Sequence, residues 1–208
     1  GIKEVVLIIG YRGDQIKSYI QSLNSPLSIV IVENKEYQKT NNMYSLYLAR
    51  DIIAGRSVII NNGDMVIDPE LVKKMIQDPN DNVVAVEPES FDEESMKVVI
   101  RSDGSISHIA KTIDAQEAFG CSIDFYKFDQ TATAKLLGRA TKIIEEQCDK
   151  NQWTEIAIDH LFRESEIYSK PFDIKNIKWV EIDNRKDLIE AQNKFSYFQD
   201  GLRESKNI

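Results

Sequence analysis

The sequence predicts an α/β fold: a three-layer α/β/α domain with a mixed, mostly parallel central sheet. Two observations predict it. Apolar, β-branched runs of strand length alternate with segments whose apolar residues recur at helical spacing. The first four runs are almost continuously apolar, as is typical of strands that both faces of a parallel sheet bury. The 208 residues suit one such domain, so we expect residues 1–208 to form a single unit.

The first half of the chain is expected to alternate strictly between strands and helices. The expected strands are residues 4–11, 27–34, 57–64 and 82–89. The expected helices are residues 13–23, 41–54 and 68–76, whose apolar positions recur every three or four residues. The third helix has the clearest start signal, because Asp68 can cap it and Pro69 suits the first helical position.

In the second half, the strict alternation of strands and helices gives way to a predicted hairpin and then to further strands and helices. Two β-rich arms within residues 96–111 flank a Ser-Asp-Gly-Ser turn, which predicts a hairpin. A strand over 121–128, helices over 132–147 and 154–165, a return strand over 172–183 and an amphipathic helix over 185–204 complete the expected order. The hairpin and the return strand make the predicted sheet mixed.

Composition excludes several classes of partner. Thirty-four acidic residues against 26 basic ones give a net charge of −8, and no basic block occurs. We expect no nucleic-acid partner, because contacts to a phosphate backbone need clustered Lys and Arg. No apolar run approaches the ~20 residues of a membrane span, so we expect no membrane insertion. Cys121 and Cys148 lack metal-ligand spacing and indicate reduced thiols in a cytoplasmic protein.

The carboxyl ends of the strands are the expected ligand positions in such a sheet. Asp64 follows a glycine at one strand end, and Asp183 ends the return strand. Two acids at neighbouring strand ends can share a divalent ion, and Mg²⁺ typically takes one or two carboxylates together with phosphates and water. The structural alternatives are that Asp183 caps the closing helix and that Asp64 stabilises its turn.

Five stretches, taken in order, resemble a known family: GIKEVVLIIGY, ENKEYQKTNNMYSLYLAR, IINNGDMVIDPEL, MKVVIRSDGSISHIAK and WVEIDNRKDLIEA. They look like the nucleotidyltransferases that charge small phosphorylated alcohols and sugars, closest to bacterial CTP:phosphocholine cytidylyltransferase-like proteins. The resemblance covers nearly the whole chain and implies a nucleotide-diphospho-sugar transferase-like fold. It also implies that an acceptor phosphate or phosphonate oxygen attacks the α-phosphorus of a nucleoside triphosphate, and that pyrophosphate leaves. Such chemistry rests on positioning and charge neutralisation.

The resemblance also implies roles for individual residues. Asp64 and Asp183 would hold Mg²⁺ between the two substrates, and Lys111 would act on the reacting phosphates. The expected nucleotide-binding residues are Gly10, Tyr11, Thr40, Asn41, Asn42, Ser45 and Gly63. The expected acceptor-binding residues are Lys97, Trp153 and Glu155. An aromatic ring beside a carboxylate suits an ammonium group.

Plain structural readings stand beside these roles. Asn41 and Asn42 could simply cap a helix, and both lysines could be solvated surface residues. Trp153 could be a buried residue at a helix start. The two histidines, His108 and His160, show no partner pattern and are expected to be structural.

One feature departs from the family. Its members begin with a strand and a glycine-rich loop carrying Arg and Lys, whose backbone N–H groups cradle the triphosphate. This sequence lacks that loop and starts where the family's second strand starts. We therefore expect an N-terminally truncated version, in which strands 4–11 and 57–64 leave backbone groups unpaired unless another segment supplies the missing strand.

Three functions are compatible with these patterns. The first is a Mg²⁺-dependent nucleotidyltransferase that uses CTP and a small phosphorylated acceptor such as phosphocholine, an aminoalkylphosphonate or a sugar 1-phosphate. The second is a glycosyltransferase with a nucleotide-sugar donor, although Asp64 and Asp68 do not form the Asp-x-Asp pattern of that class. The third is a non-catalytic, nucleotide-binding regulatory relative. A homodimer is compatible with each.

Overall fold

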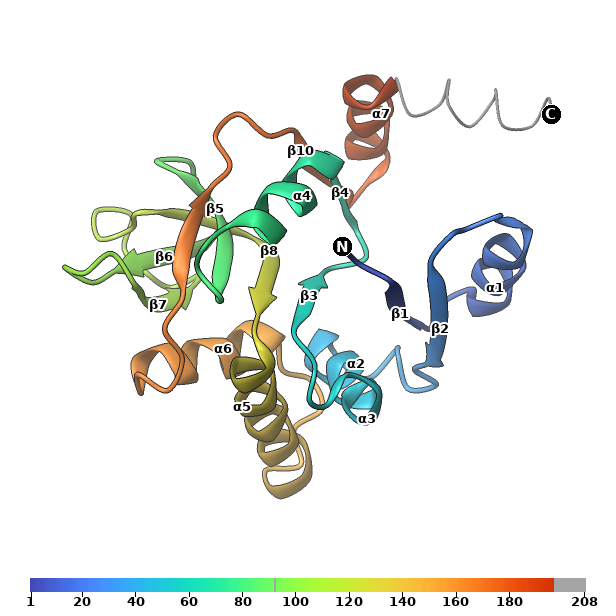
Figure 1. Cartoon of the computed structure of the whole chain (residues 1–208), viewed down its shortest axis with the longest axis horizontal. Helices are drawn as coiled ribbons and strands as arrows, with labels where there is room; N and C mark the ends of the chain where they lie inside the picture. Colours follow the sequence, from blue (N-terminus) through green and yellow to red (C-terminus); the bar gives the residue numbers. More distant parts are fainter. Residues whose placement is uncertain (92, 197–208) are drawn as a thin grey trace.

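The computed structural model describes residues 1–91 and 93–196 and shows a mixed α/β fold (Figure 1). The strands are β1 (Glu4–Ile9), β2 (Ser28–Glu33), β3 (Val58–Asn61), β4 (Met65–Ile67), β5 (Val83–Pro88), β6 (Met96–Ile100), β7 (Ile106–Ala110), β8 (Gly120–Phe128), β9 (Lys170–Asp173) and β10 (Trp179–Glu181). The helices are α1 (Gly13–Ser22), α2 (Asn42–Leu48), α3 (Arg50–Ile53), α4 (Pro69–Gln77), α5 (Gln130–Thr141), the π-helix η1 (Lys142–Glu146), α6 (Thr154–Arg163) and α7 (Arg185–Lys194).

The largest sheet is built around β8. Its order is β7-β6-β8-β5-β9, and β3 also pairs with β8. The sheet is mixed, as predicted, but the expectation of a mostly parallel sheet is wrong. Within the described ranges only β1–β2 and β5–β9 are parallel, whereas β8 runs antiparallel to β3, β5 and β6. A continuous apolar run indicates burial on both faces, and a central antiparallel strand satisfies that pattern as well as a parallel one does.

Two apolar cores on opposite faces of the large sheet confirm the three-layer architecture. Val84 and Val86 of β5 belong to the core that α2, α5 and α6 cover. Val83 and Ala85, which alternate with them, belong to the core that α4 covers. This division follows from the period of two along a strand. The helices therefore pack on both faces of the sheet (Figure 1).

The N-terminal unit β1–α1–β2 is not part of the large sheet, although one continuous sheet was expected. β1 and β2 form their own parallel pair, from Glu4↔Ser28 to Ile9↔Glu33. Among the described residues no ladder joins β1 to β3, and each of these strands has one ladder partner. Each of the two strands therefore has one edge without a ladder partner among the described residues. The helix of this unit, α1, contributes no buried side chain.

Most predicted elements are present, and the predicted start of α4 is confirmed. Asp68 caps α4 by accepting a hydrogen bond from the backbone N–H of Glu70, at 2.9 Å, and Pro69 is the first helical residue. The predicted hairpin is the antiparallel pair β6–β7. The predicted helix over 41–54 divides at Ala49 into α2 and α3. The closing helix ends at Lys194 among the described residues, and the part predicted beyond residue 196 lies outside them.

Two differences from the predicted strands matter for the site. The return strand over 172–183 is two strands, β9 and β10, separated by a turn in which Ile177 N–H donates to the Ile174 carbonyl. The short strand β4, which was not predicted, pairs antiparallel with β10. Three residues are too few for a visible alternation pattern, so β4 could be identified only from its partner. This small β4–β10 ladder positions the acidic residues described next.

Candidate active site

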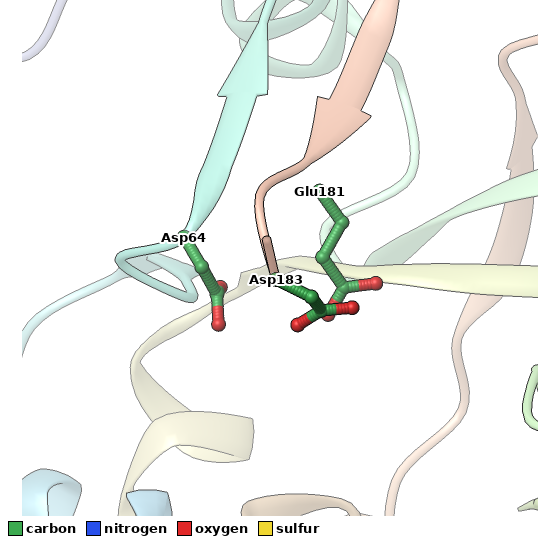
Figure 2. Close-up of side chains that lie close together, drawn as sticks. All are labelled: Asp64, Glu181 and Asp183. Atoms are coloured by element: carbon green, nitrogen blue, oxygen red, sulfur yellow. The ribbon is translucent and has the colours of Figure 1, made fainter. Parts of the chain in front are cut away.

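Three carboxylates converge at the end of the β4–β10 ladder. Met65 pairs with Glu181, and the backbone N–H of Ile182 donates to the carbonyl of Asp64 at 2.9 Å. This register places Asp64 beside Glu181 and Asp183 (Figure 2). One carboxylate oxygen from each lies within 4.8 Å of the others, and all three residues are exposed. The structure thus brings the carboxylates of Asp64 and Asp183 together, and Glu181 adds a third oxygen donor.

The helix that follows does not use Asp183 as its cap. Asn184 caps α7 in a capping box: its side chain accepts from the N–H of Asp187, whose carboxylate accepts from the N–H of Asn184. The structural alternative for Asp183 is therefore wrong. Its backbone N–H also donates to Asp187, at 3.0 Å, which fixes the peptide while the carboxylate lies with Asp64 and Glu181.

The three carboxylates of this cluster lie close enough for their charges to affect one another. The pKa of Glu181 is raised, first by burial of its carboxyl group and then by the charges of Asp183 and Asp64. Lys111 opposes the shift. Carboxylate oxygens are the ligands that Mg²⁺ prefers, and one or two of them with substrate phosphates are usual. The three donors therefore fit a hard divalent cation.

A cavity of about 300 Å³ opens beside the carboxylates. Its lining includes seven predicted site residues together with four others. The lining residues are Asn41, Asn42, Asn62, Gly63, Asp64, Met96, Lys111, Asp124, Trp153, Glu155 and Glu181. The predicted residues Gly10, Tyr11, Thr40, Ser45, Lys97 and Asp183 are not among them. The structure thus gathers residues from both halves of the chain into one pocket.

An acidic pair, the half-buried Asp124 and the buried Glu155, forms one side of the pocket. Tyr126 is fully inside the core, and its hydroxyl lies 2.9 Å from Asp124 Oδ1 and 3.2 Å from Glu155 Oε1. Burial, and next the charge of Glu155, raise the pKa of Asp124 to about 7. Burial also raises the pKa of Glu155. A phenol has one proton to donate, so Tyr126 can satisfy only one of the two carboxylates at a time.

Sequence reasoning missed Asp124, although a signal was present. The residue interrupts the apolar run CSIDFYKF in the middle of β8, where a charge is unusual in a strand buried on both faces. Its φ of 55° is left-handed, and the β5–β8 register shifts between Val84 and Val86, opposite this part of β8. Such irregularities re-aim side chains beside functional sites. Asn62 donates to Asp124 Oδ2 at 3.2 Å.

Asn41 and Asn42 make structural contacts as well as lining the pocket. Asn41 is the N-cap of α2, and its Oδ1 accepts from the N–H of Asn42 at 2.8 Å, as the capping alternative predicted. Asn42 connects two helices: its Oδ1 accepts from the N–H of Thr154 at 2.7 Å, and its Nδ2 donates to Glu155 at 3.4 Å. Asn42 therefore holds the start of α6 against the start of α2.

Thr40 and Ser45 accept hydrogen bonds from Asn34, the residue that follows β2. The side-chain amide of Asn34, which is buried, donates to Thr40 Oγ1 at 3.0 Å and reaches Ser45 Oγ at 3.4 Å. Gly10 and Tyr11 lie at the end of β1, where a Cβ on Gly10 would come within 2.6 Å of Tyr37 Cβ. The absence of a side chain at Gly10 thus permits the packing of Tyr37, whose ring centroid is 6.2 Å from that of Tyr11.

The two predicted phosphate-binding lysines differ in placement. Lys111 is the one basic residue in the pocket lining, and its ammonium lies 5.0 Å from the ring centroid of Trp153. Lys97 is buried, and its ammonium donates to the backbone carbonyl of Lys111 at 2.8 Å. Trp153 is 40% exposed, so the alternative of a buried tryptophan is wrong. Lys97 thus contacts the backbone of Lys111, and Lys111 contacts the pocket.

The sequence is similar to one protein family and to parts of two characterised proteins. Residues 1–195 match the family described as "Domain of unknown function (DUF6564)". A CMP-5'-(3-aminopropyl)phosphonate synthase of Streptomyces rubellomurinus is 28% identical over 85 residues, which are 41% of this chain and 13% of that relative. A 2-aminoethylphosphonate cytidylyltransferase of Lancefieldella rimae is 31% identical over 70 residues, which are 34% of this chain and 27% of that relative. The matched stretches are therefore short parts of both relatives.

Solved structures confirm the fold. The inositol-1-phosphate CTP transferase from T. maritima superposes with a TM-score of 0.72 at 20% identity, over 93% of this chain and 77% of that chain. The CTP:phosphocholine cytidylyltransferase from Streptococcus pneumoniae gives 0.67 at 18% identity, over 93% and 78%. The expected nucleotidyltransferase-type fold is thus confirmed. Across residues 1–91 and 93–196, none of the helices combines the length and apolar character needed to cross a bilayer.

Proposed function

The chain belongs to the family described as "Domain of unknown function (DUF6564)", and we propose that it provides the substrate site of a cytidylyltransferase. The proposed reaction transfers CMP from CTP to a small phosphorylated or phosphonate acceptor. A bond forms between an acceptor oxygen and the α-phosphorus, the bond to the bridging oxygen of pyrophosphate breaks, and pyrophosphate leaves. The observation that carries the proposal is the pocket whose lining brings Lys111 together with Asp64 and Glu181, two members of the acidic cluster that Asp183 completes.

We assign the acidic cluster to Mg²⁺. Three carboxylate oxygens within 4.8 Å of one another match the donor chemistry of this ion. When bound, the ion would supply neutralisation of the charge that develops on the transferred phosphoryl group. The β4–β10 ladder holds the backbone beside Asp64 and Glu181 in place, and the Asp187 carboxylate accepts a hydrogen bond from the Asp183 N–H.

The acceptor would lie between Lys111 and the acidic pair. Four carboxylates but one lysine line the pocket: Asp64, Asp124, Glu155 and Glu181 against Lys111. An acceptor that carries an anion at one end and a cation at the other complements this distribution. Lys111 would contact the phosphonate or phosphate, and Asp124 with Glu155 would accept hydrogen bonds from an ammonium group.

A primary ammonium fits this side of the pocket better than a quaternary one. Carboxylates with oxygen atoms 2.9 and 3.2 Å from a shared hydroxyl are hydrogen-bond acceptors, which a trimethylammonium group cannot use. A quaternary group is recognised mainly by aromatic faces, and Trp153 already faces the Lys111 ammonium at 5.0 Å. We therefore favour an aminoalkylphosphonate over phosphocholine or a sugar 1-phosphate, and the relatives named for aminoalkylphosphonates support this choice.

The nucleotide would occupy the end of the pocket that Asn41, Asn42 and Gly63 line. An asparagine amide offers both donors and an acceptor to a base edge. Asn42 has both ends of its amide engaged, with Thr154 and Glu155, whereas Asn41 has its Oδ1 engaged with the N–H of Asn42. Within this proposal Asn41 is therefore the stronger candidate to read the base.

A coupled pyrophosphate-release assay tests the function. The natural full-length protein would be given CTP, ATP or GTP with 2-aminoethylphosphonate, phosphocholine, glucose 1-phosphate or no acceptor, each with Mg²⁺ or with EDTA. We expect release that requires CTP, Mg²⁺ and the aminoalkylphosphonate together. Turnover with glucose 1-phosphate alone would overturn the acceptor assignment. Failure of every combination would overturn the proposed function.

A further inference from the structure

Asp159 of α6 joins that helix to the outer edge of β7. It is only 7% exposed. Its Oδ1 accepts a hydrogen bond from the backbone N–H of Ile109, at 2.9 Å, and lies 2.5 Å from His108 Nδ1. β7 is the terminal strand of its sheet, with β6 on its other side. A carboxylate from a helix therefore takes the place of a neighbouring strand at Ile109, and so satisfies an edge N–H that would otherwise lack a partner.

β7 leads to Lys111, at one end of the proposed acceptor site, and α6 carries Glu155, at the other end. Lys111 follows Ile109 by two residues along the chain, just after β7 ends. Glu155 precedes Asp159 by four residues on α6, and residues at this spacing lie on the same face of a helix. Both Glu155 and Asp159 are buried. The distance between the Lys111 and Glu155 side chains thus depends on how α6 sits against β7.

A second contact holds Lys111 from the opposite side. The Lys97 ammonium donates to the Lys111 carbonyl at 2.8 Å, and it also lies 3.4 Å from the carbonyl of Glu93. Lys97 belongs to β6, so this contact fixes the end of β7 to the sheet. Asp159 is then the tie between that fixed end and the helix that carries Glu155.

We propose that Asp159 is a positioning residue that sets the separation between Lys111 and Glu155, and thereby the length of the aminoalkylphosphonate that the pocket accepts. The inference rests on the proposed function. Lys111 would bind the phosphonate and Glu155 the ammonium, so a change of one methylene in the acceptor must be matched by this separation. Arg163 offers a matched control, because it reaches Asp159 Oδ2 at 3.8 Å from an exposed position and does not touch β7 through that contact.

The experiment compares kcat and KM for 2-aminoethylphosphonate and 3-aminopropylphosphonate in the natural full-length protein and four variants. These are Asp159→Ala, Asp159→Asn, His108→Ala and Arg163→Gln. Asn keeps an acceptor for the Ile109 N–H, and His108→Ala removes one of the two contacts to β7. Hydrogen exchange of the Ile109 amide reports directly whether the tie is open.

We expect the wild-type protein to prefer one acceptor length and Asp159→Ala to bring the kcat/KM ratio of the two acceptors toward one, by at least about threefold. This threefold change in the ratio is well below the ~100-fold loss of rate that a misplacement of about 1 Å can cause. KM for the acceptor should change and KM for CTP should not. Ile109 exchange should accelerate in Asp159→Ala. Asp159→Asn should retain most of the selectivity, His108→Ala should shift it less, and Arg163→Gln should match the wild type.

The outcomes separate the inference from the function on which it rests. If the wild-type protein turns over neither aminoalkylphosphonate, the proposed function fails and the inference fails with it. If the wild type is active but treats both lengths alike, or if Asp159→Ala lowers activity without changing the ratio, the inference alone is overturned. Should Asp159→Ala fail to fold, the ratio in His108→Ala decides, and an unchanged ratio there overturns it.

Discussion

Asp124 and Glu155 share the hydroxyl of Tyr126, which lies 2.9 Å from one carboxylate and 3.2 Å from the other. One residue comes from the middle of a β-strand and the other from the first turn of a helix, 31 positions later in the chain. Two neighbouring carboxylates around one phenol proton, Glu155 buried and Asp124 half-buried, repel each other when both are ionised. The first prediction below follows from this pair.

Asp124→Asn should alter the pH dependence of stability. The pKa of Asp124 in the folded protein is about 7, above the ~3.9 of an unfolded chain. Between these values the folded state binds more protons than the unfolded state, so wild-type stability should fall as pH rises from about 4 to about 7. The variant should lack this component, which is of the order of 1–4 kcal/mol. Urea unfolding at pH 5 and pH 7 measures it.

The exposed Asp81→Asn serves as the control for that experiment, because Asp81 lies away from the pocket lining. Its pH profile should follow that of the wild type. If Asp124→Asn shows the same loss of stability toward neutral pH as the wild type, the acidic pair does not store the repulsion described above.

Removal of one metal donor should weaken the response to Mg²⁺. Glu181→Gln and Asp183→Asn each take one anionic oxygen from the acidic cluster, and loss of a ligand should raise the Mg²⁺ concentration for half-maximal activity at least about tenfold. A Mg²⁺ titration of pyrophosphate release measures the effect. Asp14→Asn, at an exposed site on α1, is the control. Equal Mg²⁺ dependence in all four proteins would exclude the cluster as the metal site.

Lys111→Met should impair use of the anionic end of the acceptor. Lys111 is the one basic residue in the pocket lining, so its loss removes the cation that would face the phosphonate, at a cost of about 10²-fold in kcat/KM. Lys111→Arg should recover part of that loss because it restores the charge. Steady-state kinetics with varied acceptor measure both. A normal KM and kcat in Lys111→Met would show that another group binds the phosphonate.

Glu155→Gln and Trp153→Ala should differ in their effect on a primary ammonium. A hydrogen bond to a charged group contributes about 1.5–3 kcal/mol, so Glu155→Gln should raise KM for 2-aminoethylphosphonate about ten- to a hundredfold. Trp153 is partly exposed and already faces Lys111, so Trp153→Ala should cost less than about 1 kcal/mol. The opposite order, with phosphocholine as the better acceptor, would favour aromatic recognition of a quaternary group.

Asn41→Ala distinguishes a helix cap from a base-reading residue. Loss of the N-cap of α2 should lower stability by about 0.5–2 kcal/mol in either case. If Asn41 also reads the nucleobase, the preference for CTP over ATP and GTP should decrease, as competing-nucleotide kinetics would measure. Asp129→Ala is the control, because Asp129 caps α5 through the N–H of Ala132, at 2.6 Å, and does not line the pocket. Unchanged base selectivity in Asn41→Ala would leave only the capping role.

Some parts of the site followed from local sequence. Asp64 sits after a glycine at a strand end, and Asp183 ends the return strand, so general rules on sheets placed both near the expected ligand edge. The cap at Asp68 and the hairpin of β6 and β7 were likewise readable, because capping and turn preferences act within a few residues.

Other parts could not be read locally. Lys97 and Lys111 look alike in sequence, yet one binds a backbone carbonyl inside the protein and the other faces the pocket. Strand direction was also misjudged, since a strand buried on both faces has the same apolar pattern whichever way its neighbours run.

By itself, the sequence determined the order of most strands and helices, the acidic residues at two strand ends and the lack of a basic block. These features depend on hydrophobic periodicity and residue chemistry, which act over short spans of chain. The tertiary structure alone decided that Asp124 meets Glu155 across Tyr126, that β10 brings Glu181 to Asp64, and that Asp159 ties β7 to α6. Burial and distance between segments remote in sequence arise from packing, and they set the pKa values and contacts from which the proposed chemistry follows.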